Sequence, residues 1–172
     1  FHSDGLLLKI ISRHKMRFLQ GFKKNIKDIN GLNFVARDFD RSFLNVIDEP
    51  RWKEITYSFI DKINNKVIDE ATAKYPRELR PSVANNVAIN LKSRGDKLGL
   101  NSMKYYRFIS KEVTITGSNQ DEYFHLSNDK DLLNLKIYKK HQKTDTALLL
   151  YSRSFDPSVT KELRMYGLNG ND

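Results

Sequence analysis

The chain has 172 residues, of which 39% are hydrophobic, and a formal net charge of +9. This length suits one domain with a single sizeable core. No apolar run approaches the roughly 18 residues of a membrane-spanning helix, so we expect no transmembrane segment. The absence of cysteine excludes disulfides, thiolate metal sites and cysteine nucleophiles. The chain opens at Phe1 without a methionine, and its first apolar run is too short for a secretion signal, so we expect a fragment of a larger protein.

The basic charge is concentrated in the first two thirds of the sequence. Residues 1–111 hold 22 lysines and arginines against 12 acidic residues, a balance of +10, whereas residues 112–172 hold 8 against 9, a balance of −1. A basic surface of this kind is typical of proteins that bind nucleic acid or anionic lipid. The charges are evenly interleaved, which favours a solvated helical surface, and the binding interpretation stays open beside it.

The first elements in chain order are predicted to be a helix and a turn. Residues 6–20 have helical apolar spacing, and Gly21 marks their end. A turn signal then opens residues 30–40, where Asp38 and Asp40 stand beside Arg37. A hard cation needs several more oxygen ligands than these two carboxylates supply. We therefore interpret the pair as helix capping and an ion pair with arginine.

Three further helices are predicted before residue 98. Pro50 suits the start of the first, which carries an apolar stripe that we expect to bury Trp52 and Phe59. An asparagine at position 64 or 65 caps the second, which ends before Pro76, and we expect these two helices to form a hairpin. The third covers residues 82–98. It contains an Arg-Gly-Asp triplet, which we discount as an adhesion motif because it falls within helical periodicity.

The apolar period changes from helical to strand-like within residues 98–117. Tyr106 and Ile109 continue a fourth helix, whereas Val113 and Ile115 alternate with threonines. Strands are predicted over residues 112–116, 122–126, 133–138, 147–155 and 162–166. Short turns between them favour an antiparallel meander, one face of which would carry Val113, Ile115, Phe124, Leu126, Leu133, Leu135 and Ile137. The prediction is a single α+β domain over 1–172, with a helical layer (1–111) packed on a C-terminal antiparallel β-meander (112–172).

Several strings in this order resemble a known type of region. They are NFVARDFD, a Trp-led helix, LKSRGDKL, YYRFISKEVTITGS and YSRSFDPSVTKELRMYGLNGND. Together, residues 33–172 resemble a region of Bacteroidetes-type cell-envelope proteins that lies between a calcineurin-like metallophosphoesterase domain and an outer-membrane surface-antigen barrel. Related regions tend to show paired arginines and a Gly-Gly-Asp-Asp ending, where this chain has Arg94-Gly95 and ends in Asn-Gly-Asn-Asp. The resemblance implies an envelope location and neighbouring domains, without the phosphoesterase activity, whose metal-binding motifs this sequence lacks.

The residues themselves offer no catalytic motif. Four histidines are present without a HExxH motif or an i, i+4 pair, and the sequence has neither a Gly-x-Ser-x-Gly elbow nor a Gly-rich phosphate loop. We therefore expect no enzyme activity, no cofactor and no metal site. Residues 167–172 are weakly similar to a calcium-binding turn that would end in Asp172, but such turns bind calcium when they are stacked in repeats.

Two function classes remain. The first is a non-catalytic interaction domain of a periplasmic or outer-membrane-associated protein, with neighbouring domains of the parent protein as partners. Its predicted docking edge is the strand at residues 162–166. The second is a module that binds polyanions through the basic helices. Its candidate anion-binding residues are Lys92, Arg94, Lys97, Lys104 and Arg107.

Overall fold

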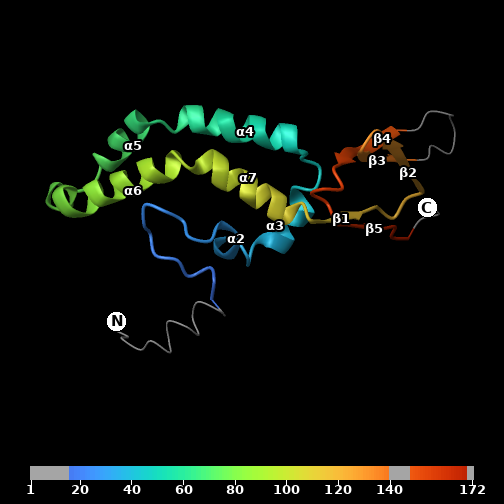
Figure 1. The fold of residues 1–172 in the computed structure, drawn as a ribbon, viewed down its shortest axis with the longest axis horizontal. Coiled ribbons are helices and arrows are strands. Elements are labelled where there is room, and N and C mark those ends of the chain that lie inside the picture. Colours follow the sequence, from blue (N-terminus) through green and yellow to red (C-terminus); the bar gives the residue numbers. More distant parts are fainter. Residues whose placement is uncertain (1–15, 140–147, 170–172) are drawn as a thin grey trace. The chain divides into compact units, whose positions relative to one another are not determined.

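The computed structural model describes residues 16–139 and 148–169 and shows a mixed α+β protein (Figure 1). Its helices are α2 (Ile29–Leu32), α3 (Arg37–Phe43), α4 (Glu49–Lys62), α5 (Asn65–Thr72), η1 (Arg77–Leu79), η2 (Arg80–Ala84), α6 (Asn85–Gly95) and α7 (Leu98–Ile109). Its strands are β1 (Glu112–Thr116), β2 (Glu122–Asp129), β3 (Leu132–Lys139), β4 (Leu148–Phe155) and β5 (Glu162–Tyr166). The change from helix to strand after residue 109 confirms the predicted change of period. The helix predicted over residues 6–20 lies mostly outside the described residues, and residues 16–20 are not helical.

Polar caps and prolines set the boundaries of α4 and α5 where the sequence placed them, whereas the third predicted helix, over 82–98, ends earlier, at Gly95. Asp48 accepts a hydrogen bond from the Arg51 N–H at 3.0 Å at the start of α4. The Asn64 side chain accepts one from the Val67 N–H at 3.1 Å at the start of α5. Such caps satisfy backbone donors that have no partner within the helix. After α5, a proline precedes η1 and another lies inside η2, where the chain turns back into α6.

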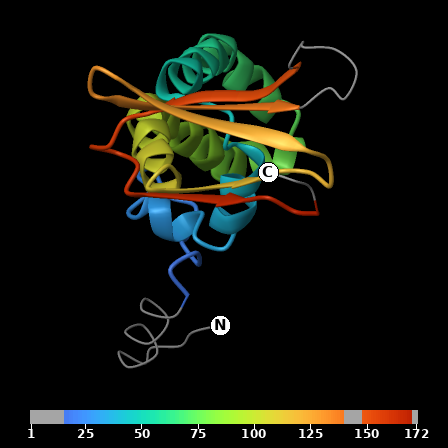
Figure 2. The same cartoon turned by 90° about the vertical axis from the view of Figure 1, so that its right-hand side faces the viewer.

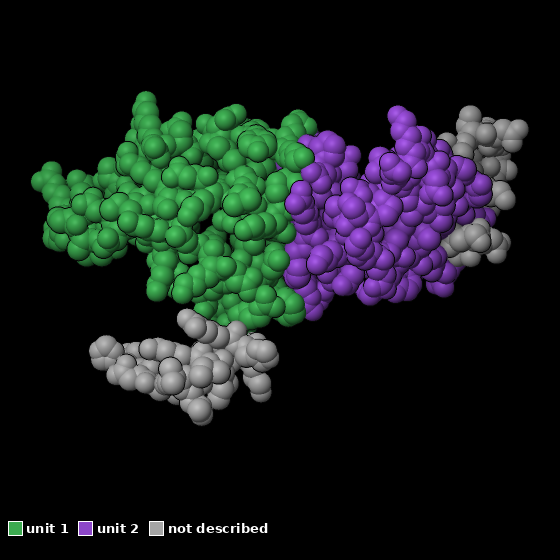
Figure 3. Space-filling view, viewed as in Figure 1, with its two compact units in different colours: residues 1–36, 53–105 green, residues 37–52, 106–172 purple. Residues whose placement is uncertain are grey.

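The chain divides into two compact units, which Figure 3 distinguishes by colour. The first, here called the helical unit, comprises Phe1–Ala36 and Lys53–Tyr105. The second, the strand unit, comprises Arg37–Trp52 and Tyr106–Asp172. The segment that contains α3 therefore belongs with the strands, although the sequence analysis assigned it to the helical part.

In the helical unit, α5 packs on α6. The α4 and α7 helices are joined by a 2.8 Å hydrogen bond between the Thr56 and Ser102 hydroxyls. The predicted hairpin of α4 and α5 is wrong, because the chain reverses after α5, in η1 and η2 (Figure 1). The predicted burial of Phe59 is also wrong, since its side chain is 53% exposed, and Trp52 is half-buried. The apolar stripe of α4 is therefore not the core of this unit.

In the strand unit, β2, β3 and β4 form the predicted antiparallel meander. Strands β1 and β5 were expected to continue it, and this expectation is wrong: they form a separate two-stranded sheet and pair in parallel. A parallel pair needs a long connection between its strands, and the whole meander supplies that connection here. Figures 1 and 2 show the β1–β5 pair beside the three-stranded sheet.

Local contacts at the end of β1 explain why it does not form a hairpin with β2. The Gly117 N–H donates to the Tyr166 carbonyl at 2.7 Å, so the β1 ladder continues along β5. The Ser118 N–H donates to the buried Glu122 carboxylate at 2.9 Å. A Cβ at position 117 would collide with that carboxylate, so any other residue there would require the Glu122 side chain to move. A short connection thus permits strand pairing but does not enforce it.

The core of the strand unit lies between its two sheets. Its buried residues are Val113, Ile115, Leu135, Ile137 and Phe155, which come from β1, β3 and β4. Leu126, which the sequence analysis placed on the same face, is exposed. The apolar strand faces therefore pack on each other within the unit. Leu163 of β5 packs against this core from the side.

Candidate functional site

Three of the five predicted anion-binding residues already make contacts within the helical unit. The Lys92 ammonium binds both carboxylate oxygens of Asp69, at 2.6 and 2.8 Å, and so ties α6 to α5. The Arg94 Nε donates to the Lys23 carbonyl at 2.8 Å, and its guanidinium lies over the Phe22 ring. The Lys97 ammonium donates to the Asn25 side chain at 2.5 Å. These three cations therefore have structural roles: Lys92 joins α5 to α6, and Arg94 and Lys97 hold residues 22–25 against the end of α6 and the turn that follows it.

The other two predicted residues, Lys104 and Arg107, are both exposed on α7. Neither side chain makes a hydrogen bond or an ion pair with another described residue. Lys104 belongs to the helical unit and Arg107 to the strand unit. The structure therefore brings together Lys92, Arg94 and Lys97, but not all five residues.

The segment fastened by α6 lines a basic pocket of about 560 Å³, whose charged residues are Arg17, Lys23, Lys27 and Asp28. Arg17 pairs with the Asp28 carboxylate at 2.7 Å. The Gly31 N–H, chiefly, and Arg17 hold the pKa of Asp28 below its usual range. Lys23 and Lys27 have no such partner among the described residues. The sequence analysis did not single out these two lysines, although the run of lysines at 23, 24 and 27 was a signal for them.

A second pocket of the helical unit, here called the helical pocket, is mostly apolar. It has a volume of about 540 Å³. Its apolar walls come from α4, α5, α7 and the connection between α4 and α5, and are formed by Tyr57, Ile60, Ile63, Ile68, Leu98 and Leu100. Two glycines, Gly95 and Gly99, also line it, and its polar rim consists of Asn64, Asn65, Lys92 and Asp96. Its volume lies within the range of about 300–1,000 Å³ typical of small-molecule sites.

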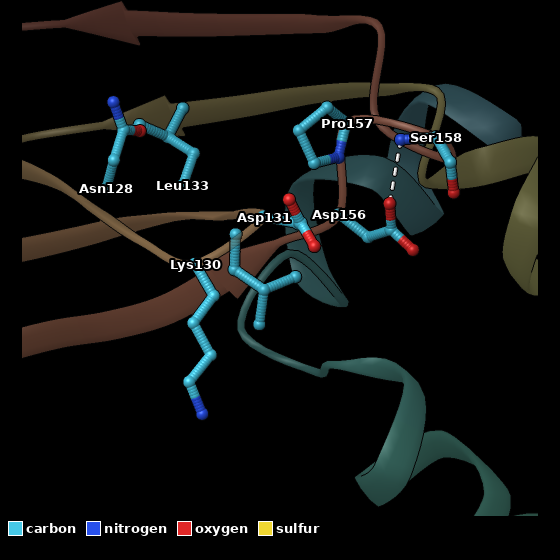
Figure 4. A pocket seen from close by; sticks show the side chains of 8 residues that line it. Asn128, Lys130, Asp131, Leu133, Asp156, Pro157 and Ser158 are labelled. Carbon is cyan, nitrogen blue, oxygen red and sulfur yellow. Dashed lines mark hydrogen bonds between the residues drawn. The ribbon is translucent and has the colours of Figure 1, made fainter.

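A third depression, of about 470 Å³, lies where the β2–β3 turn meets the loop after β4 (Figure 4). Its polar side chains include Asp131 and Asp156. Hydrogen bonds from the hydroxyl and the N–H of Ser158 hold the pKa of Asp156 below its usual value. Within residues 16–139 and 148–169, no group of three or more metal-ligating side chains is present. The candidate calcium ligand Asp172 lies outside the described residues.

The α3 helix of the strand unit is held by its polar side. The Arg41 guanidinium lies 2.8 Å from the Glu112 carboxylate on β1 and over the Phe108 ring. Two residues after the end of α3, the Asn45 side-chain amide donates to the Thr114 carbonyl of β1 at 3.0 Å. Asp38 pairs with Arg37 and Arg41, as the sequence analysis expected for this acidic segment.

The opposite side of α3 presents an aromatic pair to solvent. The rings of Phe39 and Phe43 stack with their centroids 4.1 Å apart, and the two residues are 64% and 66% exposed. No residue of α3 is buried. This helix therefore turns its charged side towards its own unit and its apolar side outwards, which is the reverse of the usual arrangement.

A buried arginine joins three segments of the strand unit. Arg153 on β4 is 6% exposed and donates to the Asn45 carbonyl at 2.5 Å. Its other terminal nitrogen lies 3.5 Å from the hydroxyls of Tyr106 and Ser110. The Tyr151 hydroxyl donates to the same Asn45 carbonyl at 2.8 Å, and burial raises the pKa of Tyr151 to about 12. Arg153 was not among the predicted site residues, because a charged residue within an alternating strand is normally expected to face solvent.

Comparison with models of protein families, with curated proteins and with solved structures found no match to this chain. Each helix of the described residues is too short or too polar to cross a bilayer. The geometry of the two units is therefore the basis on which a function is proposed.

Proposed function

We propose that this chain is a non-catalytic interaction domain that docks a neighbouring domain of a larger cell-envelope protein through α3. The observation that carries the proposal is the exposed, stacked pair of Phe39 and Phe43. Aromatic side chains contribute much of the binding free energy at interfaces, because each removes a large apolar area from water. A partner that covers both rings gains that contribution.

The way in which α3 is anchored supports this proposal. A helix that had only to stabilise the strand unit would turn its two phenylalanines inwards and its arginine outwards. Here the ion pair of Arg41 with Glu112 fixes the opposite orientation. The contact with the strand unit is thus made by polar groups, and the apolar side of α3 stays available to a partner.

An apolar segment of an adjacent domain is the partner to which we commit. Residues 33–172 resemble a region that lies between two folded domains, so a neighbour on the same chain is present at high effective concentration. The envelope location belongs to the same proposal. Fractionation of the source cells tests the location, and recovery of the parent protein in the cytosol alone would contradict it.

Covalent footprinting of aromatic side chains tests the docking surface. We expect Phe39 and Phe43 to be labelled readily in this chain and several-fold less in the parent protein with its neighbouring domains. Phe155, which is 3% exposed, serves as the control and should be labelled weakly in both. Equal labelling of Phe39 and Phe43 in both proteins would overturn the docking role of α3.

A second candidate function, polyanion binding, is favoured by the basic pocket. Arg94 and Lys97 hold the backbone and side chain of a segment whose own lysines, Lys23 and Lys27, have no acidic partner among the described residues. If this surface binds nucleic acid, its affinity must fall steeply with salt, by about 0.7–0.9 logarithmic units per phosphate contact per tenfold rise in salt. A Lys23→Gln, Lys27→Gln variant should reduce that slope, whereas Lys74→Gln, an exposed lysine outside the pocket, should not. A flat salt dependence would exclude this function.

A further inference from the structure

The helical pocket contains a helical glycine that the fold itself does not require. Gly95 is the last residue of α6, and a Cβ built on it would meet nothing within 4 Å. Glycine within a helix costs about 0.5–1 kcal/mol relative to alanine, because it loses more backbone entropy on folding. Close helix packing does not explain this glycine, because the space beside it is open. A left-handed backbone does not explain it either, because no described glycine has a positive φ. A glycine at this position leaves the backbone open to close approach by another molecule.

The walls of the pocket define the body of that molecule. Five of the side chains that line it are branched aliphatic groups, namely Ile60, Ile63, Ile68, Leu98 and Leu100, and Tyr57 is its one aromatic residue. A Cβ built on Gly99 would meet Ile60 and Tyr57 at 3.7 Å, whereas one built on Gly95 would meet nothing within 4 Å. The open volume therefore lies beside Gly95. A flexible aliphatic chain suits such a surface better than a planar ring system does.

The rim defines the other end of the molecule. Lys92 is already neutralised by Asp69, at 2.6 Å. The rim residue that carries charge without an ion pair among the described residues is Asp96, which caps the C-terminus of α6. The C-terminal end of a helix carries partial negative charge, which also favours a cation. Both features select a positively charged group.

From these observations we infer that the helical pocket binds an aliphatic amine, with its chain between α4 and α7 beside Gly95 and its ammonium group at Asp96. This site is independent of the docking surface on α3, which belongs to the strand unit. It is also distinct from the polyanion surface, which would bind a ligand of the opposite charge.

Calorimetric titration with decylamine, below the concentration at which it forms micelles, tests the inference. We expect saturable binding of one molecule per chain. Decanol has the same chain without the charge and should bind roughly two- to fivefold more weakly, which is the range for an exposed ion pair. Decanoate should bind more weakly than decanol. Absence of saturable decylamine binding, or decanoate binding as tight as decylamine, would overturn the inference.

Three variants locate the site. Gly95→Leu adds a side chain to the open volume and should weaken decylamine binding by at least about tenfold, since a change of one methylene in an apolar pocket already alters binding by that factor. Gly95→Ala should produce a smaller loss and raises helix propensity, so it guards against misfolding. Asn86→Leu places the same leucine at an exposed position of α6 and should leave binding unchanged. Equal binding to wild type and Gly95→Leu, or equal loss in Asn86→Leu, would show that the amine does not occupy this pocket.

The charge of the rim is tested separately. Asp96→Asn should reduce decylamine affinity roughly two- to fivefold and leave decanol affinity unchanged, because only the amine uses the carboxylate. Chemical shifts of the Gly95 and Gly99 amides should move during the decylamine titration. An equal effect of Asp96→Asn on both ligands would contradict the assigned orientation.

Discussion

At the scale of single residues, Arg153 shows how a buried charge can be tolerated without a carboxylate partner nearby. Its guanidinium is shared between the Asn45 carbonyl and the hydroxyls of Tyr106 and Ser110, and it lies over the Phe155 ring at 4.9 Å. None of these acceptors lies on β4: Asn45 follows α3, and Tyr106 and Ser110 lie at the end of α7 and just after it. A planar fork with several donors can serve such dispersed acceptors, whereas a single ammonium group cannot.

Arg153→Lys should therefore destabilise the protein by about 1–3 kcal/mol, the cost of buried polar groups that lose their partner. Chemical denaturation measures the change. Arg164→Lys is the matched control, because Arg164 is exposed on β5 and pairs with Glu162 at the surface. That control should cost less than about 1 kcal/mol, as exposed ion pairs do. If both substitutions had the same effect, Arg153 would not join the three segments.

A second residue-scale prediction concerns the pH dependence of Tyr151. Its folded pKa is about 12, chiefly because burial disfavours the phenolate, and the unfolded value is about 10. The phenol of Tyr151 therefore contributes its full stabilisation below about pH 10, where it is protonated in both the folded and the unfolded state. Between about pH 10 and the folded pKa, the unfolded state loses its proton first, and the stabilisation is progressively lost. Tyr151→Phe should be less stable than wild type at neutral pH, by about 0.5–1.5 kcal/mol for the lost hydrogen bond.

Denaturation at neutral pH and at increasing alkaline pH measures this difference. The deficit of Tyr151→Phe should shrink as the pH approaches 12, because only wild type then loses the contribution of the phenol. All other titrating groups are common to both proteins and cancel in the difference. A deficit that stayed constant with pH would mean that the Tyr151 hydroxyl is not buried in the folded state.

At the scale of elements, the β2–β3 hairpin has a turn residue that does not suit its conformation. The two strands are joined by Lys130 and Asp131, between the paired residues Asp129 and Leu132. Lys130 has a φ of 55°, the one positive φ of a non-glycine residue in the described chain. The left-handed region costs a side-chain-bearing residue about 1–2 kcal/mol.

Lys130→Gly should therefore stabilise the hairpin, by about 0.5–1 kcal/mol once the greater flexibility of glycine in the unfolded chain is included. Asp131→Gly is the control at the neighbouring position, where φ is not positive, and should destabilise by a similar amount. Thermal unfolding of the two variants beside wild type distinguishes them. Stabilisation by both, or by neither, would show that turn strain does not limit the hairpin.

The elements also show which parts of the fold the sequence could predict. The positions of α4, α5 and the described strands follow from local signals, such as the cap at Asn64 and the alternation through Ile115, although β2 extends three residues beyond its predicted end. Which elements pair or pack with one another does not follow from local signals. The parallel pairing of β1 with β5 depends on contacts around Gly117 that are distant in sequence. The side on which α3 packs depends on Arg41 meeting Glu112, which apolar periodicity alone does not reveal.

The candidate sites follow the same division. The cations at the end of α6 and just after it were recognisable as a cluster, because Lys92, Arg94 and Lys97 are close in sequence. That these residues are engaged with Asp69 and with residues 22–25 depends on tertiary contacts. The helical pocket is lined by residues from four helices, so no single stretch of the sequence could announce it.

At the scale of the whole molecule, the two units differ in how much apolar surface they bury. Among the described residues, the buried hydrophobic side chains of the helical unit are Ile68 and Ala84. The strand unit buries seven, namely Tyr106, Ile109, Val113, Ile115, Leu135, Ile137 and Phe155. Because apolar burial is the main stabilising contribution, the helical unit should open at a lower free energy than the strand unit.

Native-state hydrogen exchange measures both opening energies in one sample. We expect the amides of β3 to be better protected than those of α5 and α6. Leu135→Ala sharpens the comparison, because Leu135 is fully buried at 0% exposure and its truncation should cost about 2–5 kcal/mol. If the units open independently, this variant should lose protection in β3 and leave protection in α6 unchanged. An equal loss in both would show that the two units unfold as one, and equal protection of β3 and α6 in wild type would contradict the order of stability inferred from burial.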